Sequence, residues 1–373
     1  MMMTNMENKK RLVNLDLLKV VAMVMIVCLH YLGKGGILAK ATVNDPNYYV
    51  AWLFEILSVA GVNCYVLSCG YLADKSKLRF SNIISLWMQV FFVNLVCAVC
   101  AIATDNTDFS VRTLAKCLLP VTSNSYWLIT AYFIFCVLYP FFIWVAEKLS
   151  TENLKKLVIT LTCLFAVIPW QWTKIDGGYH FVWFSVLFFF ATYIKRADLL
   201  NRRIRVYLGR YALIVIVTVA LKLVVDTLAK RSAGMDFSNY VNVTNPDFLL
   251  AFAASLMLFA AFKNLKIKRT KIAEMTTFLS GLTIGVYLIH SNQFIRKTLW
   301  TKVVTAAQYF NKPYFVFHMI VCVLAVFFIC AFLEYFRQLL FKLFNIPSLC
   351  DKLGEKLQNL TDKLFSSKFI EKL

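Results

Sequence analysis

The chain has 373 residues, of which 60% are hydrophobic and only 16% charged, and its mean hydropathy is +0.66. This balance excludes an ordinary soluble domain and predicts an integral membrane protein. The formal net charge of +20 does not indicate nucleic-acid binding, because the lysines and arginines form short clusters between apolar runs, where they meet anionic lipid head groups and fix topology.

Apolar segments recur along the chain, and a spanning helix needs about 20 mostly apolar residues. In chain order they cover 12–32, 50–72, 83–103, 127–146, 156–171, 180–194, 207–225, 247–263, 277–295 and 314–336. The fifth and sixth are short, which predicts helices that tilt little or pack inside the bundle. We expect an all-α, polytopic bundle of about ten transmembrane helices, with residues 1–345 as one membrane domain.

The N-terminus imitates a signal peptide, since Lys9, Lys10 and Arg11 precede an apolar run. No small-x-small cleavage site follows, and Asp16 and Lys19 interrupt the run, so we expect a retained span.

Basic residues collect in alternate loops, which indicates orientation. One set of loops holds Lys75, Lys77 and Arg79, then Lys148, Lys155 and Lys156, then "KRADLLNRRIR" (195–205) and "KNLKIKRTK" (263–271). The other set holds fewer, although the loop before the last span carries Arg296, Lys297, Lys302 and Lys312. We expect the first set and both termini to be cytoplasmic, in a multi-pass protein of the inner cell membrane.

The tail, residues 346–373, contains leucines at spacings of three and four, with lysines between them: Leu353, Leu357, Leu360 and Leu364. This pattern predicts an amphipathic helix that lies on the cytoplasmic membrane surface as an anchor.

The first span, "NLDLLKVVAMVMIVCLHYLGKGG" (14–36), carries three ionisable residues. At ~3.6 residues per turn Lys19 and His30 differ by only about 20° around the axis, and Asp16 is a neighbour of Lys19 at i,i+3, so all three share one stripe. Each such group costs at least ~2.5 kcal/mol in lipid, so the stripe should face the bundle interior. Snorkelling of Lys19 to the head groups, paired with Asp16, is the alternative.

Other polar groups fall at the depth of His30, which the predicted topology places near the outer face. Glu55, His180, His290 and Trp127 all belong to this layer. A histidine with a carboxylate to orient it is typical of a general base that acts on a hydroxyl. Depth does not fix lateral proximity, and an interfacial aromatic belt would equally explain Trp127.

The inner basic clusters, including Arg202 and Arg205, would suit an anionic ligand such as a nucleotide phosphate, although topology-setting charge is the default explanation. The sequence has no metal motif, P-loop or dinucleotide fingerprint, and we expect no metal site.

Several blocks resemble the membrane acyltransferase-3 family. "LDLLKVVAMVMIVCLH" (15–30) is similar to its first-helix signature, in which a Leu-Asp pair and a basic residue precede a histidine. Similar blocks are "GVNCYVLSCGYL" (61–72), "YWLITAYFIFCVLYPFF" (126–142), "YHFVWFSVLFFFATYIKR" (179–196) and "LSGLTIGVYLIHSNQFIRKTLW" (279–300). Lys19 stands where the family usually has Arg, Cys69 is inserted between its Ser and Gly, and only Arg79 remains of an Arg pair.

The resemblance implies an enzyme that moves an acyl group, expected to be acetyl, from cytoplasmic acyl-CoA to a hydroxyl of a surface polysaccharide or lipid-linked glycan. It implies that His30 is essential, and we expect Glu55 to orient it. Lys19 and Asp16, with Arg202 and Arg205, would handle the donor. Trp127 and His290 would serve the acceptor or support the site.

The expected partners are membrane lipid, acyl-CoA, the glycan acceptor and other proteins of glycan synthesis, with no nucleic acid and no permanently bound cofactor. A transporter or flippase of an envelope glycan is the alternative function. It would require helices with paired Gly or Pro interruptions in two symmetric halves, which the sequence does not show. An inactive family member that acts as a structural partner is a further alternative, against which the retained Lys19 and His30 argue.

Overall fold

The structure is a computed structural model that describes residues 11–72, 79–108, 110–123, 125–167, 177–231 and 242–364. These residues form helices and no strand, which confirms the all-α expectation. The helices are α1 (Val13–Gly33), α2 (Tyr48–Leu72), α3 (Phe80–Ala103), α4 (Val111–Leu118), α5 (Trp127–Lys148), α6 (Thr151–Thr162), α7 (Phe181–Arg196), α8 (Ile204–Arg231), α9 (Leu249–Lys263), α10 (Thr270–Ser280), α11 (Thr283–His290), α12 (Arg296–Thr298), α13 (Ala306–Tyr309), α14 (Phe315–Leu343) and α15 (Ile346–Leu364). Cys163–Val167 and Leu299–Val303 are π-helical.

Six of these helices are long and apolar enough to cross a membrane: α1, α2, α3, α5, α8 and α14. The bent pair α10 and α11 could form a seventh span, and α9 is a shorter apolar helix of 15 residues. The chain is therefore a multi-pass membrane protein. The fifth predicted segment is helical up to residue 167, and its end lies outside the described residues. The total of ten spans stays a prediction.

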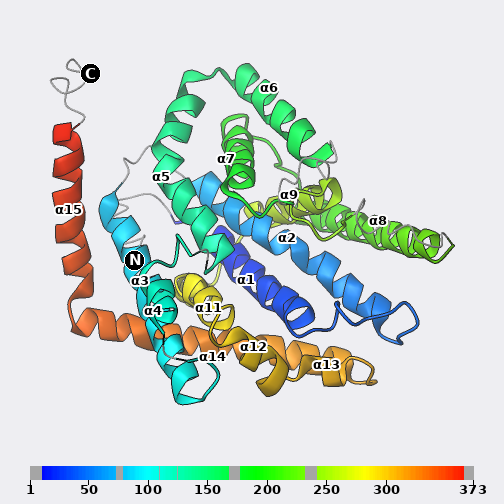
Figure 1. Ribbon diagram of the computed structural model, residues 1–373. Coiled ribbons are helices and arrows are strands. Elements are labelled where there is room, and N and C mark those ends of the chain that lie inside the picture. The colour runs from blue at the N-terminus through cyan, green and yellow to red at the C-terminus, as the bar shows by residue number, and fades with distance from the viewer. Residues whose placement is uncertain are drawn as a thin grey trace.

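Helix α1 lies inside the bundle and contacts α2, α9, α10, α11 and α14 (Figure 1). Two thirds of its apolar stretch is buried, whereas α8 buries about a fifth and leaves an apolar surface for lipid. Gly61 of α2 sets the register between α1 and α2, because a Cβ there would lie 2.8 Å from the carbonyl oxygen of Ala22. Close backbone approach at small residues is typical of helix packing in membranes.

The expectation of one continuous helix over 277–295 is wrong. Helix α10 ends at Ser280, α11 starts at Thr283 with a bend of 41° between them, and residues 291–295 leave the helix. Gly281, a poor helix former, lies in the break. Side chains satisfy the carbonyls that the break frees, since Thr283 donates to Ser280 (2.8 Å) and Gln338 to Gly281 (3.3 Å).

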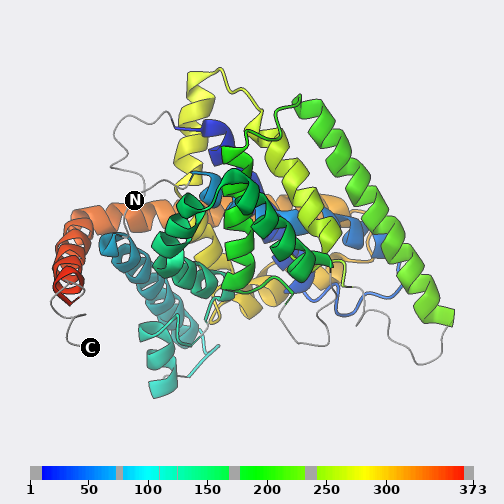
Figure 2. The ribbon, with the colours of Figure 1, turned by 90° about the horizontal axis from the view of Figure 1, so that it is seen from above.

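Helix α15 turns away from α14 and packs along α3 at one edge of the bundle (Figures 1 and 2). Gly354 meets the backbone of Ser81 so closely that a Cβ would lie 2.4 Å from its nitrogen. Leu353, Leu357 and Leu360 remain 41–48% exposed. The helical nature of the tail up to residue 364 is thus confirmed, whereas its cytoplasmic anchoring stays a prediction.

Candidate active site

Asp16 organises a buried polar cluster near the start of α1. Its side chain is 1% exposed and accepts hydrogen bonds from Arg11 Nε (2.6 Å) and from Ser280 Oγ (3.1 Å), at the break between α10 and α11. Lys19 Nζ lies 3.9 Å from the same carboxylate and is only 7% exposed. Snorkelling to the head groups therefore does not explain Lys19, because its ammonium group stays inside the bundle.

Two of the basic loops meet beside this cluster. Asn14 of α1 donates to the carbonyl oxygens of Phe262 (2.9 Å) and Lys263 (2.8 Å) at the end of α9. Lys263 in turn donates to Leu199 (2.7 Å) and to Asn201 Oδ1 (2.6 Å) in the loop between α7 and α8. We call this side of the bundle the Asp16 end, and the opposite side, where α1 finishes, the His30 end.

The basic residues at the Asp16 end have different roles. Arg196 donates to the carbonyl oxygens of Ala146 (2.7 Å) and Leu149 (2.8 Å), so it caps the C-terminus of α5. In contrast, the side chains of Arg202 and Arg205 are exposed and form no hydrogen bond or ion pair with the described residues.

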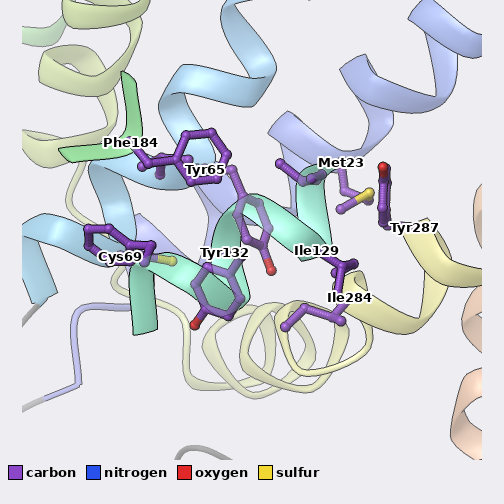
Figure 3. A pocket seen from close by; sticks show the side chains of 11 residues that line it. Met23, Tyr65, Cys69, Ile129, Tyr132, Phe184, Ile284 and Tyr287 are labelled. Atoms are coloured by element: carbon purple, nitrogen blue, oxygen red, sulfur yellow. The ribbon is translucent and has the colours of Figure 1, made fainter. Parts of the chain in front are cut away.

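A small apolar cavity, with about 30 Å³ of room for the centre of a water molecule, lies between the two ends. Helices α1, α2, α5, α7 and α11 contribute Met23, Tyr65, Val66, Cys69, Leu128, Ile129, Tyr132, Phe135, Phe184, Ile284 and Tyr287 to its wall. Figure 3 shows Cys69 and Tyr132 on one side of it and Met23 and Tyr287 on the other. Cys69 lies within electrostatic range of Lys19 and Asp16. Met23 belongs to the same face of α1 as Lys19 and His30, at i,i+4 and i,i+7.

The far side of this cavity adjoins a pair of histidines. The ring of Tyr287 lies 6.2 Å from the ring of His30 and 6.0 Å from that of His290, and the two imidazoles are 4.9 Å apart. His30 Nδ1 and His290 Nε2 are both buried and have no hydrogen-bond partner among the described residues. The structure thus brings His30 and His290 together, and each ring has one buried nitrogen without a hydrogen-bond partner among the described residues.

A backbone contact fixes the tautomer of His290. Its Nδ1 lies 2.6 Å from the carbonyl oxygen of Val286, which can only accept a hydrogen bond, so Nδ1 carries the proton. The unpartnered Nε2 is therefore a lone-pair acceptor next to His30. The carbonyl oxygen of His290 accepts from Trp300 Nε1 (3.3 Å).

The segment after His290 is held by a buried network. Tyr126 donates to Asn94 Oδ1 (3.0 Å) or to the carbonyl oxygen of Leu288 (2.9 Å), and Asn292 Nδ2 donates to Asn94 Oδ1 (2.9 Å). These bonds join α3, the start of α5 and the end of α11, so the position of His290 is determined by three helices.

A family model described as an acyltransferase domain matches residues 12–344. The chain belongs to the membrane acyltransferase-3 family. No curated protein and no solved structure matches the chain. Family membership makes this membrane protein an enzyme, an acyltransferase.

Glu55 does not orient the acyltransferase's His30 through a hydrogen bond in the described structure. Gly61 of α2 contacts Ala22 and Met25 of α1. At ~1.5 Å per residue, Glu55 lies about 9 Å from Gly61 along α2, and His30 lies about 8 Å from Met25 along α1. The two residues therefore lie at about the same depth in the bundle. Glu55 Oε2 is buried without a partner among the described residues.

The other outer-layer residues lie on two elements near Glu55. Trp127 packs edge-on against Tyr179 with the ring centres 4.8 Å apart, and Tyr179 lies within electrostatic range of Glu55. His180 is the N-cap residue of α7. Trp127 thus lies near Glu55, one of the residues expected at the depth of His30. Its contact with an acceptor stays a prediction.

Sequence reasoning missed several residues of the acyltransferase site. Tyr287 connects the cavity to the histidines, and Lys34 and Arg296 place positive charge within electrostatic range of His30. Partial burial and the charge of Arg296 lower the pKa of Lys34. The sequence offered a signal for Tyr287 alone, because it lies three residues before His290 and so on the same face of a helix. Lys34 and Arg296 come near His30 only through tertiary contacts, which the sequence does not reveal.

Proposed function

We propose that this acyltransferase transfers an acetyl group from cytoplasmic acetyl-CoA to a hydroxyl of a surface polysaccharide or a lipid-linked glycan. The observation that supports this proposal is the apolar cavity that lies between buried Lys19 and the paired histidines. A cavity between the two ends would let the donor enter at the Asp16 end while the acceptor approaches at the His30 end. The proposal includes ten spans, cytoplasmic termini and an inner cell membrane.

The donor would bind at the Asp16 end. Arg202 and Arg205 are exposed there, and guanidinium groups suit the phosphates of CoA because they offer paired donors. Lys19 would contact the donor farther inside, held by the carboxylate of Asp16, which is itself fixed by Arg11 and Ser280. The thioester arm would then extend past Cys69 and Met23 towards His30.

At the His30 end, the acceptor hydroxyl would attack the thioester carbonyl carbon. His30 takes the hydroxyl proton as the new C–O bond forms, the C–S bond breaks, and the CoA thiolate leaves and receives the proton from His30. Lys34 and Arg296 lie within electrostatic range and would stabilise the negative charge on the carbonyl oxygen. His290 would position the His30 ring, because its Nε2 can accept an N–H bond from it.

A second route uses His30 as a carrier. An imidazole nitrogen attacks the thioester carbonyl carbon, the C–S bond breaks as the C–N bond forms, and the imidazole N–H proton passes to the CoA thiolate. The acceptor hydroxyl then attacks the acyl-imidazole, the C–N bond breaks, and the hydroxyl proton returns to the imidazole. This route fits a donor and an acceptor that arrive from opposite sides at different times. Rapid acid quenching followed by mass spectrometry of the peptide that contains His30 distinguishes the routes, because only the carrier route yields an acetylated peptide.

A transporter is the competing function, and the break between α10 and α11 is the feature that favours it. The two functions differ in whether a covalent bond forms. Membranes that contain the wild type are incubated with [acetyl-14C]acetyl-CoA and an extract of envelope glycan. The proposal predicts alkali-labile label on glycan with the wild type and none with His30→Ala. Label that is equal in both, at equal protein level, would remove His30 from the mechanism, and no label in either would favour transport.

A further inference from the structure

A second polar cluster lies between α2 and α8, away from the histidine pair. Lys222 contacts Asp226 one turn further along α8, donates to Tyr48 Oη (3.0 Å), and lies 4.2 Å from the ring centre of Trp52. Both charged side chains are about nine-tenths buried, within a helix that is otherwise largely apolar and exposed. An ion pair inside a span is expensive, so it indicates a function.

Two polar atoms of this cluster have no partner. Asp226 Oδ2 and Trp52 Nε1 are buried and form no hydrogen bond with any described residue, although Asp226 Oδ1 contacts Lys222 and the Lys222 ammonium has two partners. One is an acceptor and the other a donor. Leaving both unpaired would cost about 1–3 kcal/mol each. A bound group that both donates and accepts would remove this cost.

The chemistry of the cluster favours an uncharged hydroxylated ligand. Because Asp226 neutralises Lys222, the cluster has no net charge, and a phosphate or carboxylate would meet the Asp226 oxygen. A hydroxyl group can donate to Asp226 Oδ2 and accept from the indole N–H. Tyr48 and Trp52, whose rings lie 6.1 Å apart, add aromatic surface for the C–H groups of a sugar ring.

The cluster lies at the His30 end of the bundle. Trp52 is nine residues from Gly61, or about 14 Å along α2, whereas His30 is about 8 Å beyond the contact of Gly61 with Met25. Trp52 is therefore roughly one helical turn farther out than His30. Glu55, at i,i+3 from Trp52, lies at the depth of His30, and its Oε2 is buried without a partner among the described residues.

We propose that Tyr48, Trp52, Lys222 and Asp226 form a binding subsite for an uncharged sugar unit of the acceptor, about one helical turn farther out than the reaction site. This inference rests on the proposed function, since it assigns the acceptor class for the same site. The subsite would hold one sugar of the glycan while another presents its hydroxyl to His30.

Two changes separate this role from a structural one. Trp52→Phe removes the indole N–H and keeps an aromatic ring, with Trp144→Phe as the matched control, because Trp144 is 60% exposed on α5. The paired change Lys222→Met with Asp226→Leu removes both charges together, which avoids leaving one buried charge alone. Thermal unfolding of each purified variant in detergent checks that it folds.

Sugar binding is measured directly, by saturation-transfer NMR of the purified protein with glucose, galactose, N-acetylglucosamine and rhamnose, and with glucuronate as the charged comparison. We expect at least one neutral sugar to bind the wild type and Trp144→Phe. The same sugar should bind Trp52→Phe about tenfold more weakly, the loss of about one hydrogen bond, and the paired variant not at all. Preference for glucuronate, no binding by the wild type, or equal binding by all variants would overturn the proposal and leave a structural ion pair or a bound water.

This measurement does not depend on catalysis. If neutral sugars bind as expected but membranes transfer no acetyl group, the proposed function fails and the subsite stands as a sugar site. If membranes transfer acetyl normally but no neutral sugar binds, the subsite alone is wrong. In active membranes, Trp52→Phe should raise the KM for the acceptor about tenfold and leave the KM for acetyl-CoA unchanged.

Discussion

Gly285 of α11 provides a sharp test of the packing that positions His290. A Cβ at this residue would lie 2.3 Å from Oε2, Cδ and Cγ of Glu334 in α14. Glu334 is 0% exposed and accepts from Arg337 Nε (2.8 Å) and Nη2 (2.7 Å). Ordinary contact begins near 3.4 Å, so Gly285→Ala must push the carboxylate away by about 1 Å, and at least one of these bonds must lengthen or break.

The expected destabilisation follows from two effects. Overpacking costs about 1–3 kcal/mol, and a lost hydrogen bond to a charged group costs about 1.5–3 kcal/mol. Together they predict a loss of about 2.5–6 kcal/mol and a Tm lower by about 3–8 °C for a chain of 373 residues. Because His290 follows five residues later on α11, transfer activity should fall as well.

The assay is thermal unfolding of the purified protein in detergent, with acetyl transfer measured on the same preparation. Gly209→Ala is the matched control, because a Cβ there meets nothing within 4 Å and the residue lies inside α8. That variant should be as stable as the wild type or slightly more so. A Gly285→Ala protein with the Tm and activity of the wild type would refute the reasoning.

Three further changes test the proposed path of the acyl group. Lys19→Ala removes one charge-assisted hydrogen bond, so it should raise the KM for acetyl-CoA about tenfold or more and the KM for the acceptor less. A larger rise in the acceptor KM than in the acetyl-CoA KM would place Lys19 away from the donor. Val66→Phe, which narrows the cavity, should lower kcat/KM for butyryl-CoA more than for acetyl-CoA, and an equal effect on both donors would argue against the cavity as the acyl path. His290→Phe should lower kcat about 100-fold and alter its pH profile through misplacement of His30, whereas an unchanged profile would make His290 a packing residue.

The stripe on α1 could be predicted from the sequence because it depends on helical periodicity alone. Asp16, Lys19 and His30 occur at spacings that any regular helix places on one face, and lipid penalises charge strongly enough to turn that face inward. The structure agrees, since Asp16 and Lys19 are almost completely buried. Helix type and position followed from the same rule for most segments.

Lateral contacts could not be predicted, because depth along a span does not fix which helices are neighbours. Glu55 shares the level of His30 but makes no described bond to it, and the ring that faces His30 belongs to His290. The break at Gly281 was missed because the flanking residues keep an apolar average and the freed carbonyls find partners only in the folded bundle. The contact between Gly285 and Glu334 likewise depends on two helices far apart in the sequence.

The central claim, that this protein transfers an acyl group to a glycan hydroxyl and needs His30 to do so, is tested most directly by the ester-linked acetate on envelope polysaccharide. Cells that lack the protein are supplied with the wild type or with His30→Ala, matched for membrane level and for Tm after purification. Acetate released by mild alkali is then measured per sugar. The account predicts acetate above background with the wild type and background acetate with His30→Ala. Equal ester content in the two strains would contradict it.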